Sequence, residues 1–349
     1  MGTTYRVNPF KEDGDPTIVA AERAARPHSA RSHTEVSEGP VPAERAPAFD
    51  PTCPFCPGNE TETPPEVAAS RPTGTAPDTP GWEVRVVPNK YPALTAPPGG
   101  RAPGDEIVFA PDDIYDDCDA LGLHEVAIHS PDHGGRLSTI GSAALSTTMQ
   151  MWQERLEAHR DDGWPTTTLV VNEGREAGAS LAHPHAQLFA TELIPPLLER
   201  ELWVQDRYHE RLGRRLLDDV VTAEAGSDRH VATGGPLVAW APYWAEVPYE
   251  VWIAGREPDS VSGRFADSPH VDALAALIGR VTRAIAAVAG DPALNVVVRD
   301  VPHAGSHTAR WHVRVVPRTS IAAGFEIATG MRILTHSPEV AADALRAEV

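Results

Sequence analysis

The 349-residue chain carries 30 Lys and Arg against 49 Asp and Glu, a formal net charge of −19 that would repel nucleic-acid backbones and anionic lipid. Hydrophobic residues make up 41% of it, enough for a sizeable core and, at this length, for one large domain or two. It has no apolar run of about 18–20 residues, no leader pattern and only three cysteines, which predicts a soluble cytoplasmic protein without a membrane span, secretion signal or disulfide framework.

The first third of the chain is rich in proline, and residues 27–80 show neither helical nor strand periodicity, which predicts loops that wrap a folded body. Within them, Cys53-Pro-Phe-Cys56 has the spacing of half a tetrahedral zinc site. Its remaining ligands should be histidines, and the site should pin this segment rather than leave it as a disordered tail. A redox pair is less suited, since the flanking prolines do not supply the helix N-terminus that such thiols need. Cys118 stands alone and is expected to be an inert buried thiol.

From residue 82 onward, short apolar strands alternate with amphipathic helices. The first half is expected to hold strands at 83–88, 106–110, 125–130, 167–172 and 185–191 and a helix at 139–160, and a second helix is expected at 196–220, after this half ends. The second half is expected to hold strands at 236–241, 249–254, 294–300 and 310–317 and a helix at 271–289. The order strand, strand, long helix, strand, strand therefore occurs twice. It predicts an α+β protein of two related, mostly antiparallel halves, 1–192 and 193–349, with two unrelated α+β units as the alternative.

Two segments offer the histidines that the cysteines require, His129-Ser-Pro-Asp-His133 and Ala182-His-Pro-His-Ala-Gln187. In an extended segment His183 and His185 point the same way, because side chains alternate between the two faces. A metal on one histidine would then fix the position of the other. For any single histidine, an ordinary surface position is the alternative.

A glycine-rich loop, Asn172-Glu-Gly-Arg-Glu-Ala-Gly-Ala-Ser180, lies directly before this histidine pair. Such a loop can present backbone N–H groups to phosphate oxygens, although it is a weak signal by itself. Next to an imidazole, it predicts chemistry at phosphorus. The histidine would attack to give a phosphoramidate, and a second acceptor would then take the group.

These motifs form an ordered set along nearly the whole chain, from residue 23 to the end. The set comprises CPFCPGNE, VRVVPNKYPAL, SPDH, NEGREAGASLAHPHAQ, APYWAEVPYE and GFEIATG. It resembles the galactose-1-phosphate uridylyltransferase family of the histidine-triad superfamily, which includes the ADP-glucose phosphorylases. The resemblance implies two histidine-triad-like halves, each a mostly antiparallel sheet with flanking helices, and a homodimer.

The resemblance also implies roles for individual residues. One structural Zn²⁺ would be held by four residues, Cys53, Cys56, His133 and His183. His185 would be the nucleophile that becomes nucleotidylated, and Gln187 would bind the phosphoryl oxygens. Substrate contacts would come from eight residues: Arg23, Arg26, Phe55, Asn89, Asn172, Gly178, Ser180 and Glu326. Of these, Phe55 and Asn89 would lie near the base and ribose, Glu326 near the hexose hydroxyls, and the others near the phosphates.

The sequence departs from the family pattern at a second metal site, which some members build from one glutamate and three histidines. Glu201 and His312 match two of these ligands, but Arg299 and Arg314 stand in place of the other two. A guanidinium stays protonated and cannot ligate a metal, so we expect a Glu–Arg ion pair and no second metal. Aligning the halves sets His183-x-His185-x-Gln187 against Arg310-x-His312-x-Arg314. The arginines of this copy are expected either to be solvated or to meet an anionic substrate or Glu201.

The resemblance implies a double-displacement nucleotidyltransferase, in which an NDP-sugar gives its NMP to His185 and a second sugar 1-phosphate takes it. UDP-glucose and a hexose 1-phosphate would serve the uridylyltransferase branch, and inorganic phosphate would be the acceptor in the ADP-glucose phosphorylase branch. Base and sugar stay open, because Asn89-Lys-Tyr replaces the base-contacting segment of the uridylyl enzymes and Ser320 replaces a lysine of the hexose site. The further alternatives are a nucleotide hydrolase of the histidine-triad type and a non-catalytic nucleotide-binding module.

Overall fold

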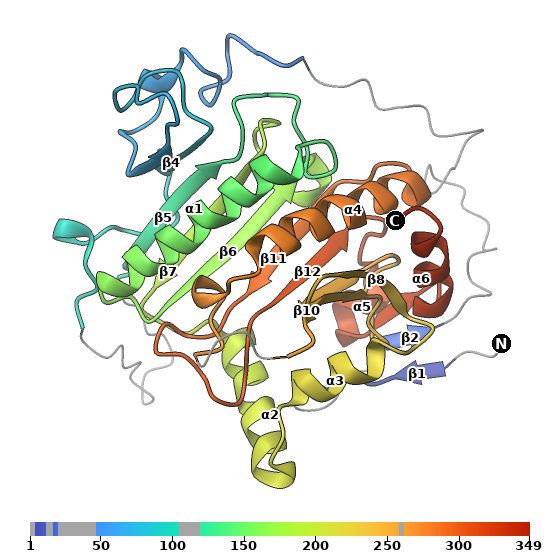
Figure 1. Ribbon diagram of the computed structural model, residues 1–349. Coiled ribbons are helices and arrows are strands. Elements are labelled where there is room, and N and C mark those ends of the chain that lie inside the picture. The colour runs from blue at the N-terminus through green and yellow to red at the C-terminus, as the bar shows by residue number, and fades with distance from the viewer. Residues whose placement is uncertain (1–3, 12–16, 20–46, 105–118, 258–261) are drawn as a thin grey trace.

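The computed structural model describes residues 4–11, 17–19, 47–104, 119–257 and 262–349 (Figure 1). Its largest element is a ten-stranded sheet in which every neighbouring pair of strands is antiparallel. The strands are, in chain order, β3 (Ala68–Ser70), β4 (Val84–Pro88), β5 (Gly122–Ile128), β6 (Thr166–Glu173), β7 (His185–Thr191), β8 (His230–Gly234), β9 (Leu237–Trp240), β10 (Val251–Gly255), β11 (Leu294–Arg299) and β12 (His312–Pro317). In space they follow the order β3-β4-β5-β7-β6-β11-β12-β10-β9-β8.

Two long helices, α1 (Ser142–Asp161) and α4 (Val271–Ala289), lie side by side across one face of this sheet (Figure 1). Each follows one pair of strands and precedes another, so the succession β4, β5, α1, β6, β7 is repeated as β9, β10, α4, β11, β12. The two sets run in reversed order through the sheet and meet where β6 pairs with β11. The predicted α+β fold of two mostly antiparallel halves is confirmed. The boundary between residues 192 and 193 stays a prediction, because one sheet joins both sides.

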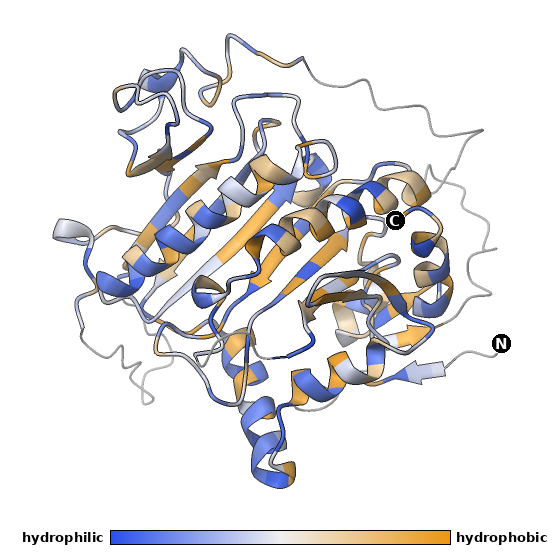
Figure 2. Cartoon of the chain, in the orientation of Figure 1, coloured by the Kyte–Doolittle hydropathy of each residue, from blue (hydrophilic) through white to orange (hydrophobic). Residues whose placement is uncertain are grey.

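The helices cover the face of the sheet that carries the main apolar core. Met149 and Trp152 of α1 are almost wholly buried in a cluster with alternate residues of β7, Ala186 and Leu188. Figure 2 shows the central strands as mostly hydrophobic, as expected for strands in the middle of a covered sheet. Successive side chains of a strand point to opposite faces, so His185 and every second residue after it point away from the helices. This second face carries the candidate site.

Most predicted elements lie where the sequence places them. The strand at 185–191 and the helix at 271–289 have the predicted bounds. The other predicted strands of the described residues, and the helix at 139–160, differ from the structure by at most three residues at either end. The strand predicted at 106–110 and the isolated Cys118 lie outside the described residues.

The single helix predicted at 196–220 is wrong. The structure has two helices there, α2 (Pro196–Leu212) and α3 (Leu216–Glu224). Gly213 separates them with a φ of +68°, and its N–H donates to the His209 carbonyl (2.7 Å). A left-handed residue ends a helix, and glycine adopts this conformation without steric cost.

The structure also contains short elements that the sequence pattern did not indicate. Besides β3 and β8 of the large sheet, they are β1 (Thr4–Arg6), β2 (Thr17–Val19), β13 (Arg332–Leu334), α5 (Gly324–Thr329) and α6 (Pro338–Arg346). The three strands form a small sheet, which brings segments from both ends of the chain together. Residues 47–80 are mainly loop, as predicted, apart from β3 and one turn of 3-10 helix. Within the described parts of the chain, no helix is both long and apolar enough to cross a membrane.

Candidate metal centre and nucleophile

The loop that carries the two cysteines is fixed by hydrogen bonds. Its turn closes between the Cys56 N–H and the Cys53 carbonyl (3.2 Å), and the Asn59 side chain donates to the same carbonyl (2.8 Å). The backbone N–H of His133 donates to the Ala48 carbonyl (2.9 Å), which ties the loop to the Ser-Pro-Asp-His segment. The segment around the cysteines is therefore pinned to the rest of the chain, as predicted.

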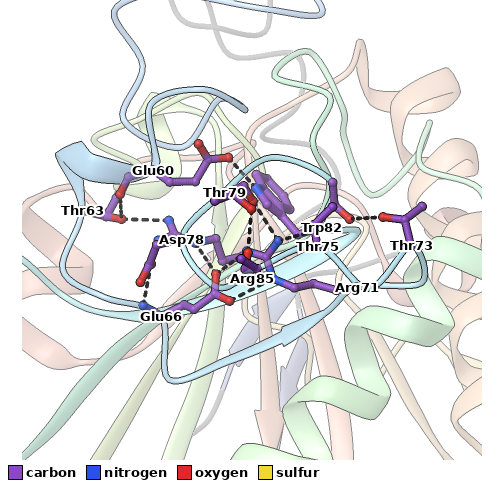
Figure 3. Close-up of polar contacts among 12 residues, drawn as sticks. Glu60, Thr63, Glu66, Arg71, Thr73, Thr75, Asp78, Thr79, Trp82 and Arg85 are labelled. Carbon is purple, nitrogen blue, oxygen red and sulfur yellow. Dashed lines mark hydrogen bonds and ion pairs between the residues drawn. The ribbon is translucent and has the colours of Figure 1, made fainter.

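A buried charge network anchors the same segment to β4 (Figure 3). Arg85 of β4 is only 1% exposed, and its guanidinium donates to the carboxylate of Glu66 (2.9 Å) and the hydroxyl of Thr63 (2.8 Å). Burial alone would raise the pKa of Glu66, but hydrogen bonds from Arg71 and Arg85 bring this pKa below its ordinary value. Glu66 therefore stays charged, like Arg71 and Arg85, and these ion pairs fix the loop that follows the cysteines.

Glu60 connects this region with the cysteine loop itself (Figure 3). Its carboxylate accepts hydrogen bonds from the Trp82 indole N–H (2.9 Å) and from the backbone N–H of Gly58 (2.9 Å). Gly58 follows Cys56 by two residues, and Trp82 is buried in an apolar cluster with Val87 of β4. The buried carboxylate of Glu60 thus links the cysteine loop to the cluster that packs on β4.

The four predicted metal ligands converge. Cys53, Cys56, His133 and His183 are all buried, and one donor atom from each lies within 4.8 Å of the others. The Cys56 sulfur is 3.5 Å from Nδ1 of His133 and 3.7 Å from Nδ1 of His183, and the Cys53 sulfur is 3.8 Å from Nδ1 of His183. A tetrahedron with Zn–S near 2.3 Å and Zn–N near 2.0 Å has edges of roughly 3.3–3.8 Å. The four side chains therefore form a cluster that fits a four-coordinate metal ion.

The protonation of the cluster suits metal binding. Nε2 of His183 lies 2.7 Å from the Ser130 carbonyl, which can only accept, so Nε2 carries the proton and Nδ1 presents its lone pair to the cysteines. Burial lowers the pKa of His183 to about 4, which keeps this ring neutral. Burial raises the pKa of Cys53 to about 11. A thiolate at Cys53 would therefore need a cation beside it, as a bound metal ion would provide.

His185, the first residue of β7, is oriented by the preceding histidine. Its Nδ1 lies 2.8 Å from the carbonyl oxygen of His183, so Nδ1 carries the proton and Nε2 carries the lone pair. Burial lowers the pKa of His185 below its ordinary value of 6.5, so the ring is neutral near pH 7. The Phe55 ring lies edge-on to this imidazole, with ring centroids 5.4 Å apart. A neutral imidazole held in this way can act as a nucleophile toward phosphorus.

The pairing of strands brings other predicted residues to the face of His185. Gln187 lies two residues further along β7, and because Val171 of β6 pairs with Ala186, the next residue, Asn172, comes beside His185. Asn89 follows β4, and its backbone N–H donates to the carbonyl of His124 in β5 (2.8 Å). The structure thus places Phe55, Asn172 and Gln187 next to His185, and it places Asn89 beside His124, whose ring also contacts Gln187.

The glycine-rich loop uses some of its N–H groups internally. Gly178 adopts a φ of +92°, and its N–H donates to the Arg175 carbonyl (2.9 Å). The N–H of Ala179 likewise donates to the Gly174 carbonyl (3.2 Å). These two groups are therefore not presented to a ligand in this conformation, in contrast to the predicted cradle of N–H groups. Ser180, by contrast, is exposed at the end of the loop.

Of the three remaining predicted substrate residues, the structure describes one. Arg23 and Arg26 lie outside the described residues. Glu326 lies in α5, where its carboxylate accepts a hydrogen bond from the Ala323 N–H (2.9 Å) at the start of its own helix. This hydrogen bond stays within α5 and its first turn, and among the described residues it involves none of the side chains near His185.

Two further polar residues contact the site, and the sequence analysis missed both. Nε2 of His124 in β5 lies 2.9 Å from Oε1 of Gln187, and Nδ2 of Asn295 in β11 donates to Oδ1 of Asn172 (2.8 Å). Asn295 is the one polar residue in the stretch 294–298 of β11, whereas His124 stands directly before Glu125 in β5. For Asn295 the available signal was a polar side chain within an apolar strand, but the adjacent polar residues of β5 have no period of two and gave no such signal for His124.

The second half carries its own buried ion network. Glu201 of α2 pairs with Arg299 of β11, with 3.0 Å between Oε2 and Nε. Burial raises the pKa of Glu201 and lowers that of Arg299, so each group depends on the other to remain charged. The predicted Glu–Arg ion pair is present, and the absence of a second metal stays a prediction.

The expectation that the arginines of β12 and its approach are solvated is wrong, whereas a contact with an anionic substrate stays a prediction. Arg310 pairs with Asp218 of α3 (2.5 Å), and Arg314 pairs with Glu250 (3.0 Å). Neither is a solvated arginine, and neither forms the ion pair with Glu201. The reason is that each guanidinium has a nearer carboxylate, which compensates for its burial.

A family model for the N-terminal domain of galactose-1-phosphate uridyl transferase matches residues 2–195, more than half of the chain. The chain belongs to this family. The resemblance carried by the sequence motifs is thereby confirmed, and the antiparallel α+β architecture is that of the family.

Relatives of two kinds are similar to the chain. The ADP-glucose phosphorylase of Arabidopsis thaliana is 29% identical over 336 residues, which cover 94% of this chain and 89% of the relative. The galactose-1-phosphate uridylyltransferase of Haemophilus influenzae is 28% identical over 258 residues, which cover 73% of this chain and 68% of the relative. The crystal structure of the Arabidopsis ADP-glucose phosphorylase with bound ADP-glucose superimposes with a TM-score of 0.80 at 25% identity, over 99% of this chain and 98% of the other.

Replacing one ligand of the cysteine–histidine cluster should reduce stability and activity together. We expect Cys53→Ser to lower the melting temperature and nucleotide transfer, because the cysteine loop loses its link to His183. Elemental analysis of the purified wild-type protein should find one zinc ion per chain. Thr61→Ala, an exposed change in the same loop, is the control and should alter neither property. Wild-type protein that is fully active without zinc would contradict the prediction.

Breaking the ion pair of the second half should destabilise the protein. Arg299→Met leaves the Glu201 carboxylate buried without its cation, which should lower the free energy of unfolding by about 3 kcal/mol, measured by urea denaturation. Arg207→Met is the matched control, because it removes the exposed pair with Glu210 and should cost less than about 1 kcal/mol. Equal losses from the two variants would show that the buried pair has no special role.

Proposed function

We propose that the protein is a nucleotidyltransferase that moves an NMP group from an NDP-sugar to a phosphate-bearing acceptor through a covalent nucleotidyl-His185. One observation carries the proposal. The Nδ1–H of His185 donates to the His183 carbonyl (2.8 Å), which leaves the lone pair of a neutral imidazole on Nε2. Gln187 and Asn172 lie on the same face as this nitrogen. The relatives, a phosphorylase and a uridylyltransferase, support the same class of reaction.

In the first step, the Nε2 lone pair of His185 attacks the α-phosphorus of the NDP-sugar. An N–P bond forms, the P–O bond to the sugar 1-phosphate breaks, and the sugar 1-phosphate leaves with that electron pair. Nδ1 keeps its proton, and its hydrogen bond to the His183 carbonyl stabilises the positive charge that the ring acquires. In the second step, a phosphate oxygen of the acceptor attacks the same phosphorus, and the N–P bond breaks to return a neutral imidazole.

We propose Zn²⁺ as the metal of the cluster, with Cys53, Cys56, His133 and His183 as its ligands. A zinc ion with four protein ligands supplies structural support and no reacting group. His183 would bind it through Nδ1, while its carbonyl accepts a hydrogen bond from the Nδ1–H of His185. The residues that bind the metal would therefore also determine where the nucleophile lies.

Gln187 favours transfer over hydrolysis. A histidine at this position could take a proton from water as a general base. The amide of glutamine can only donate and accept hydrogen bonds, so it can stabilise the charged phosphoryl oxygens without activating water. The intermediate should then persist until an acceptor phosphate arrives. This argues against a hydrolase of the histidine-triad type.

The acceptor divides the proposal into two candidates. A uridylyltransferase would use UDP-glucose and a hexose 1-phosphate, and an NDP-sugar phosphorylase would use inorganic phosphate. The phosphorylase is the relative that matches over 94% of this chain, against 73% for the uridylyltransferase, which favours the second candidate. Both candidates share the attack of His185 and differ in base and acceptor.

Further contacts complete the proposed site. We propose Phe55 and Asn89 for the base and ribose; the Phe55 ring lies edge-on to His185, and Asn89 contacts His124, the neighbour of Gln187. The phosphates would be held with the help of Arg23, Arg26, Asn172, Gly178 and Ser180. We further propose that the protein is a homodimer and that Glu326, whose carboxylate caps its own helix α5, serves the hexose across the interface between subunits.

Removing the nucleophile should abolish labelling by the nucleotide. Wild-type protein incubated with an NDP-sugar labelled in its α-phosphate should retain label after denaturation, and the adduct should be acid-labile, as a phosphoramidate is. We expect no label with His185→Ala and full labelling with His307→Ala, an exposed histidine. Burial holds the pKa of His185 below 6.5, so protonation removes the lone pair only at lower pH. The labelling rate should therefore be constant from pH 8 to 6.5 and fall below it; a tenfold fall within that range would contradict the assignment.

A panel of NDP-sugars and acceptors should separate the candidates. Label from ADP-glucose that is discharged by inorganic phosphate would identify a phosphorylase, and label from UDP-glucose that is discharged by a hexose 1-phosphate would identify a uridylyltransferase. Because Gln187 provides no base, wild-type protein without acceptor should release free NMP much more slowly than it transfers it. Release at a rate equal to transfer would mean that the protein is a hydrolase.

A further inference from the structure

Two side-chain amides flank His185, and their orientation decides what they can do. Gln187 follows it on β7, and Asn172 stands beside it on β6. Each amide has an NH₂ group that attracts a phosphoryl oxygen and a carbonyl oxygen that repels it. An amide that is free to flip by 180° would present its carbonyl oxygen to the phosphoryl oxygens part of the time. Both amides therefore need a partner behind them that accepts only one orientation.

His124 provides such a partner for Gln187, because the backbone determines its tautomer. The Ala93 N–H points at Nδ1 of His124 at 3.1 Å. A backbone N–H can only donate, so Nδ1 must be the unprotonated nitrogen and the proton of the neutral ring must lie on Nε2. Burial lowers the pKa of His124, which supports the neutral ring. Nε2–H then donates to Oε1 of Gln187 (2.9 Å) and turns the NH₂ group of this amide away from His124.

Among the residues that the structure describes, Asn89 makes the one competing contact. Its Nδ2 also lies 3.0 Å from Nε2 of His124, while its Oδ1 accepts from the backbone N–H of Tyr91 (2.8 Å). Two N–H groups cannot share one hydrogen bond, so either the Asn89 amide or the Ala93 N–H must lose its bond to the ring. Asn89 is half-buried and can rotate its side chain, whereas the Ala93 N–H belongs to the backbone. The Nε2–H tautomer is therefore the one that the surroundings favour.

Asn295 provides the corresponding partner for Asn172. Its NH₂ group donates to the backbone carbonyl of Ala177 (2.9 Å) and to Oδ1 of Asn172 (2.8 Å). A carbonyl can only accept, so the Ala177 contact fixes which end of Asn295 is the NH₂ group. Oδ1 of Asn172 thus accepts a hydrogen bond from Asn295, and the NH₂ group of Asn172 points away from Asn295. Asn172 and Asn295 are directly paired across β6 and β11, so this contact is built into the sheet.

We propose that His124 and Asn295 are positioning residues, which hold the amides of Gln187 and Asn172 with their oxygens turned back and their NH₂ groups presented to the phosphoryl oxygens at His185. The proposal rests on the nucleotidyl transfer proposed above. It makes the two neutral amides a matched pair of donors, one on each side of the attacked phosphorus. Anionic oxygens gain charge-assisted hydrogen bonds from such donors without the repulsion that a turned amide would cause.

Replacement of His124 tests the first half of the proposal. His124→Phe removes both ring nitrogens and keeps an aromatic ring stacked on Phe189, whose centroid lies 4.1 Å away. One neutral hydrogen bond in the site is worth about a tenfold change, so we expect kcat/KM and the labelling rate to fall about tenfold. His124→Gln restores an amide donor near the position of Nε2 and should recover most of the rate.

A double-mutant cycle separates positioning from a general loss of structure. If His124 acts through Gln187, His124→Phe should have no further effect on labelling in a Gln187→Ala background. Asn295→Ala should likewise cause no further loss of labelling in an Asn172→Ala background. Melting temperatures, measured alongside, show that all variants fold. Losses that multiply in the double variants would overturn the proposal, because the partners would then act independently of the amides.

A spectroscopic test does not depend on activity. In protein labelled with ¹⁵N-histidine, correlations between ring nitrogens and carbon-bound protons distinguish the two neutral tautomers, and His124→Phe identifies the signals of His124. We expect the Nε2–H tautomer at pH 7.5. The Nδ1–H tautomer or a charged ring would overturn the proposal. If the wild-type protein carries this tautomer but is not labelled by any NDP-sugar, the proposed function fails and the assignment of His124 as the partner of Gln187 stands on the ring signals alone.

Discussion

The candidate site depends on one hydrogen bond, from Nδ1 of His185 to the carbonyl oxygen of His183 (2.8 Å). The same His183 turns its own Nδ1 toward the two cysteine sulfurs, so the cluster and the nucleophile are joined through a single residue. Pro184 lies between the two histidines, and its fixed φ leaves the pair few ways to move relative to each other. Whatever holds the cysteine loop, including the buried carboxylates of Glu60 and Glu66, therefore also determines the direction of the lone pair on His185.

Local patterns were sufficient to predict the parts of the structure that carry their own signal. The alternation of β7 and the apolar stripe of α4 gave their bounds, and the CxxC with its histidines gave the cluster, because metal ligands are few in kind and regular in spacing. The break at Gly213 was missed because the expected helix was drawn through a glycine that takes a left-handed conformation in the structure. The three-residue strands at the two ends of the chain are too short for a period, and they form only by pairing with each other.

The same distinction explains which site residues escaped the sequence. His124 and Asn295 gain their roles only when β5 pairs with β7 and β6 pairs with β11. Neither residue stands in a motif, and nothing local connects His124 with Gln187 or Asn295 with Asn172. In the second half, His312 shows how differently a similar position can be used. Its ring stacks on Trp252 with centroids 4.5 Å apart and is surrounded by the charges of Arg299, Arg310 and Arg314.

The join between β6 and β11 has a consequence for the history of the chain. The shift in numbering that carries His185 onto His312 also carries Val170 onto Val297, and these two valines face each other across the join. Two copies of one ancestral polypeptide, docked edge to edge about a twofold axis, would pair this position with itself. Fusion of the two genes would preserve such a contact and cover two strand edges permanently. One copy could then keep its nucleophile while the other exchanged it for arginines and aromatic packing.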